Sequence, residues 1–241
     1  FIELPRAMNV PDKCVCYIDD IVIPVSWKTI DDRNNKLYIA YRIGSITAST
    51  DLTMAHGNYT GVSFATSLES LMNTVLSVWK TPVAVTYDYS NNQLTINLLD
   101  NRTIVEGTEL DVAIQGDFDS NTRKSLNGVL MITSTVNIDL TTPFVTHLDL
   151  HTTRNLYLSS SSLGSYNTIS NFGSDVIIKK IPVRYNYNEM LFDSAEAGYD
   201  YLDVSKRLLR RIDFRLQDSF GNIINLNKNH WSFSLIFQLQ E

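Results

Sequence analysis

The stretch HLDLH places two imidazoles and a carboxylate at alternate positions, His147, Asp149 and His151. Alternate side chains of a β-strand share one face, so these three groups would lie on the same side. Histidine nitrogens and a carboxylate are suitable ligands for a transition metal. Residues four apart on a strand are about 13 Å apart, however, so one ion cannot contact all three without a bulge. We therefore expect a polar face that meets solvent or a neighbouring subunit, and keep a metal site as the less favoured alternative.

Two pairs of adjacent aspartates invite comparison with the paired carboxylates of glycosidases. Asp19 and Asp20 fall within a β-branched stretch, where neighbouring side chains face opposite ways and cannot cooperate. Asp31 and Asp32 fall in a polar turn, where aspartate commonly makes local hydrogen bonds. We expect neither pair to be catalytic.

Motifs for nucleophilic or cofactor chemistry are absent from the sequence. It contains no Gly-x-Ser-x-Gly, no His-Glu-x-x-His, no P-loop and no dinucleotide-binding fingerprint. Cys14 and Cys16 lie two apart in an apolar strand pattern, which is an awkward geometry for a disulfide. We predict two reduced thiols, no enzyme activity and no cofactor.

The overall composition is that of a globular protein, with 44% hydrophobic and 19% charged residues among 241. A net charge of −6 argues against a general nucleic-acid binder, which normally carries a basic excess. No apolar run approaches the roughly 20 residues that a membrane-spanning helix needs. The one basic cluster, KRLLRR at 206–211, predicts a solvated face or an intersubunit contact, with binding of an anionic partner as the alternative.

The C-terminus shows strict alternation of apolar and mostly polar residues, which predicts a half-buried strand. We expect its apolar side chains to fill a core between two sheets, and we expect this strand to pair with residues 211–217 through a connection rich in Gly and Asn. In that second stretch Ile212, Phe214 and Leu216 would point inward. The apolar residues of the last strand are Trp231, Phe233, Leu235, Phe237 and Leu239, and the outward residues of the other are Arg211, Asp213, Arg215 and Gln217.

One segment has helical instead of strand periodicity. Apolar residues recur at helical spacing from Gly61 to Trp79, Thr60 is available as the N-cap and Pro82 ends the segment. A hairpin follows, with its reversal at residues 90–92. Further strands are predicted at residues 14–25, 36–43, 49–54, 102–106, 110–114, 128–136, 145–151, 155–158 and 176–183, and a surface loop at 159–174.

Short strands about ten residues apart, separated by turn residues, indicate an all-β sandwich or jelly roll. We expect residues 1–56 and 101–241 to form this domain. Residues 57–100 would form an inserted helix-hairpin subdomain.

Four stretches in order resemble a known family: YIDDIVIPVSWKTIDDRNNKLYI, GNYTGVSFATSLESLMN, TRNLYL with TISNFGSDVIIKKIPV, and IDFRLQDSFGNIINLNKNHWSFSLIF. They are similar to the minor capsid (penton) proteins of Polinton/Maverick elements, adinto-type viruses and virophages. The resemblance implies a single jelly roll with an outward-facing insertion. It also implies a homopentamer at each vertex of an icosahedral virion, assembled inside the host cell beside a double jelly-roll major capsid protein. The family has no active-site residues to carry over.

Two other functions are consistent with a jelly roll. A module that binds a carbohydrate or a host receptor, like a spike or fibre head, would use loops such as SSSSLGSYNTISNFG, rich in Ser and Asn. A metal-dependent oxygenase would rest on His147, Asp149 and His151, and metal analysis of the purified protein tests for it.

Overall fold

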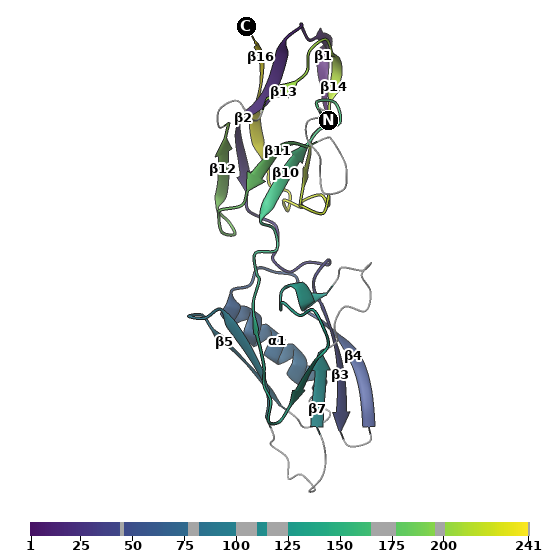
Figure 1. Cartoon of the computed structure of the whole chain (residues 1–241), viewed down its shortest axis with the longest axis vertical. Helices are drawn as coiled ribbons and strands as arrows, with labels where there is room; N and C mark the ends of the chain where they lie inside the picture. The colour runs from purple at the N-terminus through teal and green to yellow at the C-terminus, as the bar shows by residue number, and fades with distance from the viewer. Residues whose placement is uncertain are drawn as a thin grey trace. The chain divides into compact units, whose positions relative to one another are not determined.

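The computed structural model describes residues 1–43, 46–76, 82–99, 110–114, 125–164, 177–195 and 201–240. Its contacts divide the chain into two compact units, which Figure 1 shows together. The sandwich unit comprises Phe1–Trp27 and Thr153–Glu241, and the helix unit comprises Lys28–Thr152. The helix unit is therefore an insertion in the chain of the sandwich unit.

The first sheet of the sandwich unit is built around β2 (Cys14–Pro24). Along one side β2 pairs with β16 (Ser232–Leu239), and all pairings in this sheet are antiparallel. Along the other side it pairs with β12 (Met190–Ser194) and with the short β13 (Leu202–Asp203). Both β12 and β16 are therefore outer strands of this sheet among the residues that the structure describes.

A second sheet places β10 (Asn155–Ser159) between β11 (Ile177–Pro182) and β15 (Arg215–Gln217). A separate ribbon joins β1 (Ile2–Asn9) to β14 (Leu208–Ile212). Buried apolar side chains from both sheets and from the ribbon belong to one core. They include Ile18 and Ile23 of β2, Leu158 of β10, Ile181 of β11, Leu191 of β12 and Leu216 of β15.

A β-bulge in β2 explains an irregular stretch of sequence. Ile21 pairs with Phe233 and Ile18 pairs with Leu235, so β2 has one residue more than β16 over this interval. The β2 side chains that belong to the core are even-numbered up to Ile18 and odd-numbered from Ile21, while Asp19 and Asp20 between them are both exposed. The expectation that these two carboxylates face opposite ways is therefore wrong, because the bulge interrupts the alternation there.

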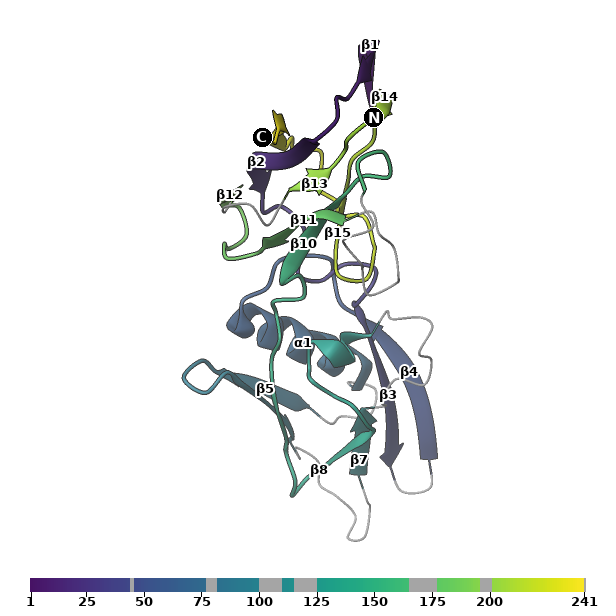
Figure 2. The same ribbon diagram turned by 45° about the horizontal axis from the view of Figure 1, so that its top comes forward.

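The helix unit contains two antiparallel sheets and one α-helix among its described residues (Figure 2). One sheet has the order β4 (Ile46–Thr53), β3 (Lys36–Ile43), β7 (Leu110–Ile114) and β8 (Val136–Asp139). The other has the order β5 (Val83–Asp88), β6 (Gln93–Leu98) and β9 (Phe144–His147). A short 3-10 helix, η2 (Leu126–Gly128), completes the unit.

Helix α1 (Gly61–Leu76) begins where the sequence predicts. The Thr60 hydroxyl accepts a hydrogen bond from the Ser63 N–H at 3.2 Å, as an N-cap does. The side chains of Phe64, Leu68 and Met72 are completely buried in the unit's core. The helix start also lies close to β5, since a Cβ added at Gly61 would lie 2.2 Å from the ring of Tyr87. Only glycine fits this position without movement of that ring.

Several sequence expectations differ from this fold. The compact unit around the helix spans Lys28–Thr152 rather than 57–100, because β3, β4, β7 and β8 share a core with α1. Residues 128–136 are not a strand; η2 and a turn precede β8 there. The expected pairing between residues 211–217 and the C-terminal strand is also wrong: β15 pairs with β10, and β16 pairs with β2. Residues 102–106, Trp79 and residues 165–174 lie outside the described residues.

Candidate assembly surfaces

The stretch HLDLH does not form the continuous strand that its alternation predicts. β9 ends at His147, which is exposed and pairs with Gln93 of β6. Beyond it the Asp149 N–H donates to the Val129 carbonyl at 2.8 Å, and the Asp149 carboxylate accepts from the His151 N–H at 3.0 Å. The carboxylate therefore organises a local turn. Among the described residues, the structure holds no group of three or more His, Cys, Asp or Glu side chains that could bind a metal ion.

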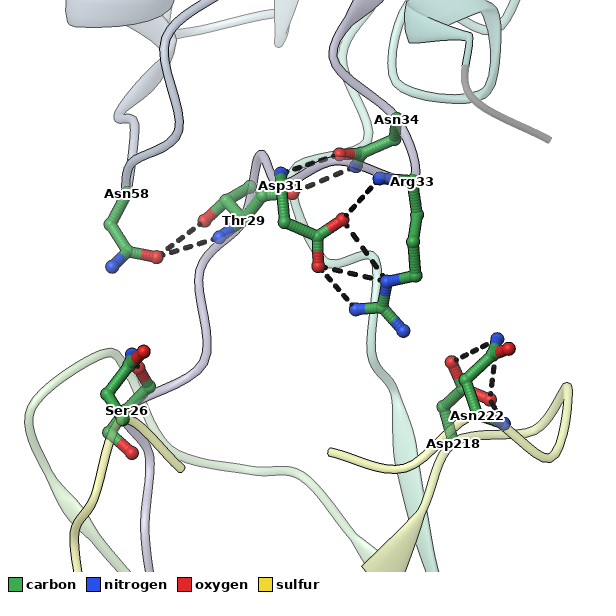
Figure 3. A network of polar contacts seen from close by, with 9 residues as sticks. Ser26, Thr29, Asp31, Arg33, Asn34, Asn58, Asp218 and Asn222 are labelled. Atoms are coloured by element: carbon green, nitrogen blue, oxygen red, sulfur yellow. Dashed lines mark hydrogen bonds and ion pairs between the residues drawn. The ribbon is translucent and has the colours of Figure 1, made fainter. Parts of the chain in front are cut away.

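The carboxylate of Asp31 is committed to its own turn, as Figure 3 shows. It accepts the Arg33 N–H at 2.8 Å and three contacts from the guanidinium, Nη2 to Oδ2 at 2.6 Å and Nε to Oδ2 and Oδ1 at 2.9 and 3.1 Å. Burial of this carboxyl favours a higher pKa, but the hydrogen bonds from Arg33 outweigh it and lower the pKa. Nearby, Asn58 Oδ1 accepts from the N–H and hydroxyl of Thr29 (Figure 3). These contacts match the structural role expected of Asp31.

A similar turn lies within the sandwich unit, on the connection from β15 to β16. Asp218 accepts the N–H groups of Phe220 and Asn222 at 2.8 and 2.9 Å, and the side chain of Asn222 also donates to it (Figure 3). Gly221 has a φ of 81°, which the predicted Gly-Asn turn requires. Further along this connection, the Leu226 carbonyl accepts a hydrogen bond from the hydroxyl of Ser26 at 2.8 Å. This connection is therefore anchored at both ends.

The two cysteines are buried free thiols, in agreement with the expected absence of a disulfide between them. Cys16 is completely buried within the core of the sandwich unit. Burial raises the pKa of its thiol to about 12, so the thiolate is not populated at neutral pH.

Asp213 was expected to point outward, and here the alternation rule gives the wrong answer. The residue is 6% exposed, and its carboxylate accepts four hydrogen bonds, from the N–H and the hydroxyl of both Ser161 and Ser162, at 2.8 to 3.2 Å. Burial of the carboxyl favours a higher pKa, but these bonds outweigh it and lower the pKa to about 2. The serine run therefore forms a fixed turn at its start, where the sequence suggests only surface loop.

The basic cluster 206–211 is divided among separate contacts. Lys206 forms an exposed ion pair with Asp12 at 3.2 Å. Arg207 donates to the carbonyl oxygens of Ser162 and Gly164 at 3.3 and 3.0 Å. The guanidinium of Arg211 lies 3.6 Å from the centre of the Phe1 ring, a cation–π contact. These three side chains are therefore engaged in separate contacts within the sandwich unit.

The outer edge of β5 is covered by side chains of helix α1. The amide of Asn73 donates to the Val83 carbonyl at 2.9 Å and accepts the Val83 N–H at 2.7 Å. The Glu69 carboxylate accepts the N–H of Val85 at 2.8 Å. These backbone groups point away from β6, so the helix takes the place of a neighbouring strand. A covered edge of this kind cannot pair with another chain.

The outer edge of β16 has no such cover among the described residues. No described strand pairs with the side of β16 that faces away from β2. Phe233, Leu235 and Phe237 pack against the core, as predicted, but remain only half-buried. The ring of Phe233 stacks on Trp231 at 5.1 Å between centroids and meets Phe214 edge-on at 4.6 Å. An aromatic cluster thus lies along an open sheet edge.

The opposite edge of the same sheet presents exposed apolar side chains. On β12, Phe192 is 61% exposed and Met190 is 42% exposed, while Leu191 between them is buried. The strand is fixed to β11 by an ion pair of 3.2 Å between Asp193 and the buried Lys179. Phe and Met are enriched in the cores of protein interfaces. Both open edges of this sheet therefore have the character of contact surfaces, a signal that strand periodicity alone does not contain.

Comparison with known proteins gives one likeness, at the level of the fold. No family model matches the sequence, and no curated protein matches it. Among solved structures, the mavirus penton protein is similar over 98% of this chain and 89% of that chain, with a TM-score of 0.58 and 10% sequence identity. At this identity the likeness establishes the fold, and it confirms the all-β class and the resemblance to penton proteins at that level. Among the described residues, no helix is long and apolar enough to cross a membrane.

Proposed function

We propose that this chain is a minor capsid (penton) protein whose pentamers close the five-fold vertices of an icosahedral capsid, of a double-stranded DNA virus or of a virus-like transposon. The observation that carries the proposal is the extent of the structural likeness. It spans nearly the whole of this chain and of the mavirus penton protein, so both compact units are included. The function proposed for this chain is structural and requires no catalytic centre.

The architecture supports the more detailed form of this proposal. The sandwich unit is built from two segments of chain that flank residues 28–152, as expected of a single jelly roll carrying an insertion. The sandwich unit would form the ring in the virion shell, beside a double jelly-roll major capsid protein. The helix unit would be the part that faces outward, and assembly would take place inside the host cell.

A five-fold ring sets a requirement on the surface of each subunit. Every copy must contact its neighbours through two different patches, one on each side, because cyclic rings other than dimers use heterologous contacts. The open edges of β16 and β12 are two such patches on one chain.

The mass of the protein in solution tests the proposal. We expect size exclusion with light scattering to give five times 27.3 kDa, either for the protein alone or after coexpression with the major capsid protein. Salt and protein concentration should be varied, since a ring held by weak contacts dissociates on dilution. A chain that stays monomeric under every condition that assembles the capsid would contradict a penton role.

A second function is favoured by one feature of the helix unit. Tyr89 is 82% exposed at the tip of the β5–β6 hairpin, beside the exposed Ser90 and Asn91. An exposed ring flanked by hydrogen-bonding side chains suits a glycan or a receptor protein. Binding on a glycan array that is lost in Tyr89→Ala and kept in Thr86→Ala would establish it, and silence across a broad array would count against a sugar ligand.

A further inference from the structure

We propose that, in the pentamer, strand β16 of each copy pairs with strand β12 of the next copy, so that one sheet continues from subunit to subunit. This inference rests on the proposed function and names the surface that would close the ring. The partner that binds the outer edge of β16 is a second copy of this chain.

The sequence of β16 lacks every usual protection of an open edge. Proteins discourage edge-to-edge pairing with charged residues, proline, short strands or a covering element. The eight residues SFSLIFQL contain no charge, no proline and no glycine. The edge of β5 in the same chain is covered by Asn73 and Glu69, whereas the described residues leave that of β16 uncovered. An unprotected edge of this length indicates a partner.

The burial of β16 is incomplete on the side that faces the core. Its residues Phe233, Leu235 and Phe237 pair with Ile21, Ile18 and Cys16 of β2. Those three partners are only 1%, 2% and 0% exposed, while the β16 side chains are half-buried. The sandwich therefore buries these core-facing side chains of β2 fully and those of β16 in part. A further strand beyond β16 would remove more apolar surface from water, which stabilises the contact.

Strand direction and charge favour β12 of a second copy as that strand. β12 and β16 both run antiparallel to β2, so they run parallel to each other. In a ring whose five-fold axis runs along the strands, rotation from one copy to the next preserves the direction of each strand. Strand β16 would therefore meet β12 of the next copy as a parallel pair. Residues 223–240 contain Lys228 and His230 and no carboxylate, whereas Glu189 directly precedes β12. These opposite charges favour the heterologous contact over contact between two β16 edges.

The register within the sheet shows which residues would meet. Ser232 and Phe192 both pair with Val22, so they lie at one level on opposite sides of β2. Two residues further along each strand, Ser234 of β16 lies opposite the bulge at Asp19–Asp20, and Ser194 of β12 pairs with Asp20. Ser194 and Ser234 are both exposed and therefore lie at matching levels of the two edges. If the sheet continues without a shift, Ser234 of one copy lies next to Ser194 of the following copy.

Disulfide cross-linking of the double variant Ser194→Cys/Ser234→Cys tests this contact. Within one chain the two positions are separated by two strand spacings, about 10 Å, which is too far for a disulfide. The native Cys14 and Cys16 are buried. We expect mild oxidation of the assembled protein to give a covalent ladder from dimer to pentamer on a non-reducing gel. The double variant Phe192→Cys/Ser232→Cys tests the adjacent level in the same way.

Matched controls separate this arrangement from random collisions. The double variant Ser90→Cys/Ser234→Cys carries the same number of new thiols, with one moved to the exposed turn of the β5–β6 hairpin, and should give no ladder. A mixture of the single variants Ser194→Cys and Ser234→Cys should give dimers only. Dimers from Ser234→Cys alone would mean that two β16 edges meet, which overturns the proposal.

The mass measurement distinguishes failure of this inference from failure of the proposed function. A particle of five times 27.3 kDa in which neither cysteine pair forms a ladder would overturn the contact and leave the penton role intact. Cross-links from Ser234→Cys to the major capsid protein would also overturn it, because that protein would then occupy the edge. A protein that is monomeric with and without the major capsid protein would contradict the penton role itself.

Discussion

Strands β5 and β16 are both outer strands, but the chain treats their edges in opposite ways. The backbone groups of Val83 and Val85 on β5 are bonded to Asn73 and Glu69 of helix α1. No described element takes that place beside β16. The helix follows one edge because it directly precedes β5 in the chain, whereas the described connection from β15 to β16 contains no helix. Under the proposed function, one edge would serve folding of the subunit and the other would serve assembly.

The largest contrast is expected between two phenylalanines. Phe64 of helix α1 is completely buried in the core of the helix unit, so Phe64→Ala should lower the free energy of unfolding by about 3 to 5 kcal/mol. Phe192 is exposed at the open side of its sheet, so Phe192→Ala should change it by less than about 0.5 kcal/mol and instead weaken the pentamer. Urea unfolding and light scattering measure the two effects. Equal losses of stability would remove the distinction between the two regions.

Removal of the cover from β5 should have the next largest effect. Asn73→Ala leaves the N–H and the carbonyl of Val83 without their partner, which should cost about 2 to 4 kcal/mol of unfolding free energy. Ser70→Ala, on the exposed side of the same helix, is the control and should be close to neutral. A second expected result is new self-association through the uncovered edge, seen as a rise in mass. A variant as stable and monodisperse as its control would show that the helix does not protect β5.

The buried carboxylate of Asp213 should make the sandwich unit sensitive to acid. Its pKa in the folded protein, about 2, lies below the ordinary aspartate value of 3.8, so its stabilising effect is present above pH 4 and is lost as the pH falls through 2. Asp213→Asn should therefore cost on the order of 2 kcal/mol at pH 7 and only a few tenths near pH 2. Urea titrations at both pH values measure this difference in unfolding free energy between the variant and the parent protein. A free-energy difference that does not change with pH would mean that the charge of Asp213 does not stabilise the folded protein.

The smallest effect on stability is expected at the open edge itself. Ser234 is exposed on β16, so Ser234→Lys should alter the free energy of unfolding by no more than about 0.5 kcal/mol. A lysine on an edge strand discourages pairing, so the same variant should shift the mass from pentamer toward monomer. Ser90→Lys in the β5–β6 turn adds the same charge away from the edge and should leave the mass unchanged. Pentamers of Ser234→Lys as stable as those of the control would argue against an assembly role for this edge.

Residue periodicity predicted elements well where alternation ran without interruption. The strands at residues 36–43, 155–158 and 232–239 and the hairpin of β5 and β6 lie where apolar residues alternate. Periodicity gave wrong predictions where one extra residue shifts the apolar–polar alternation of a strand, or where a polar side chain is buried. The bulge at Asp19–Asp20 reverses the parity of β2, and Asp213 is buried because two serines far away in the sequence supply four hydrogen bonds. Neither event has a local signature.

The residue pattern was sufficient to predict the all-β class, the helix with its Thr60 cap, and the apolar face of the last strand. These features follow from propensity and periodicity, which report whether a face is buried. The pairing of β16 with β2 across more than two hundred residues, and the open outer edge of β16 among the described residues, could be seen only in the folded chain. A periodic pattern specifies a buried face but not the strand that lies beside it, so the edge available for assembly became visible only in the folded chain.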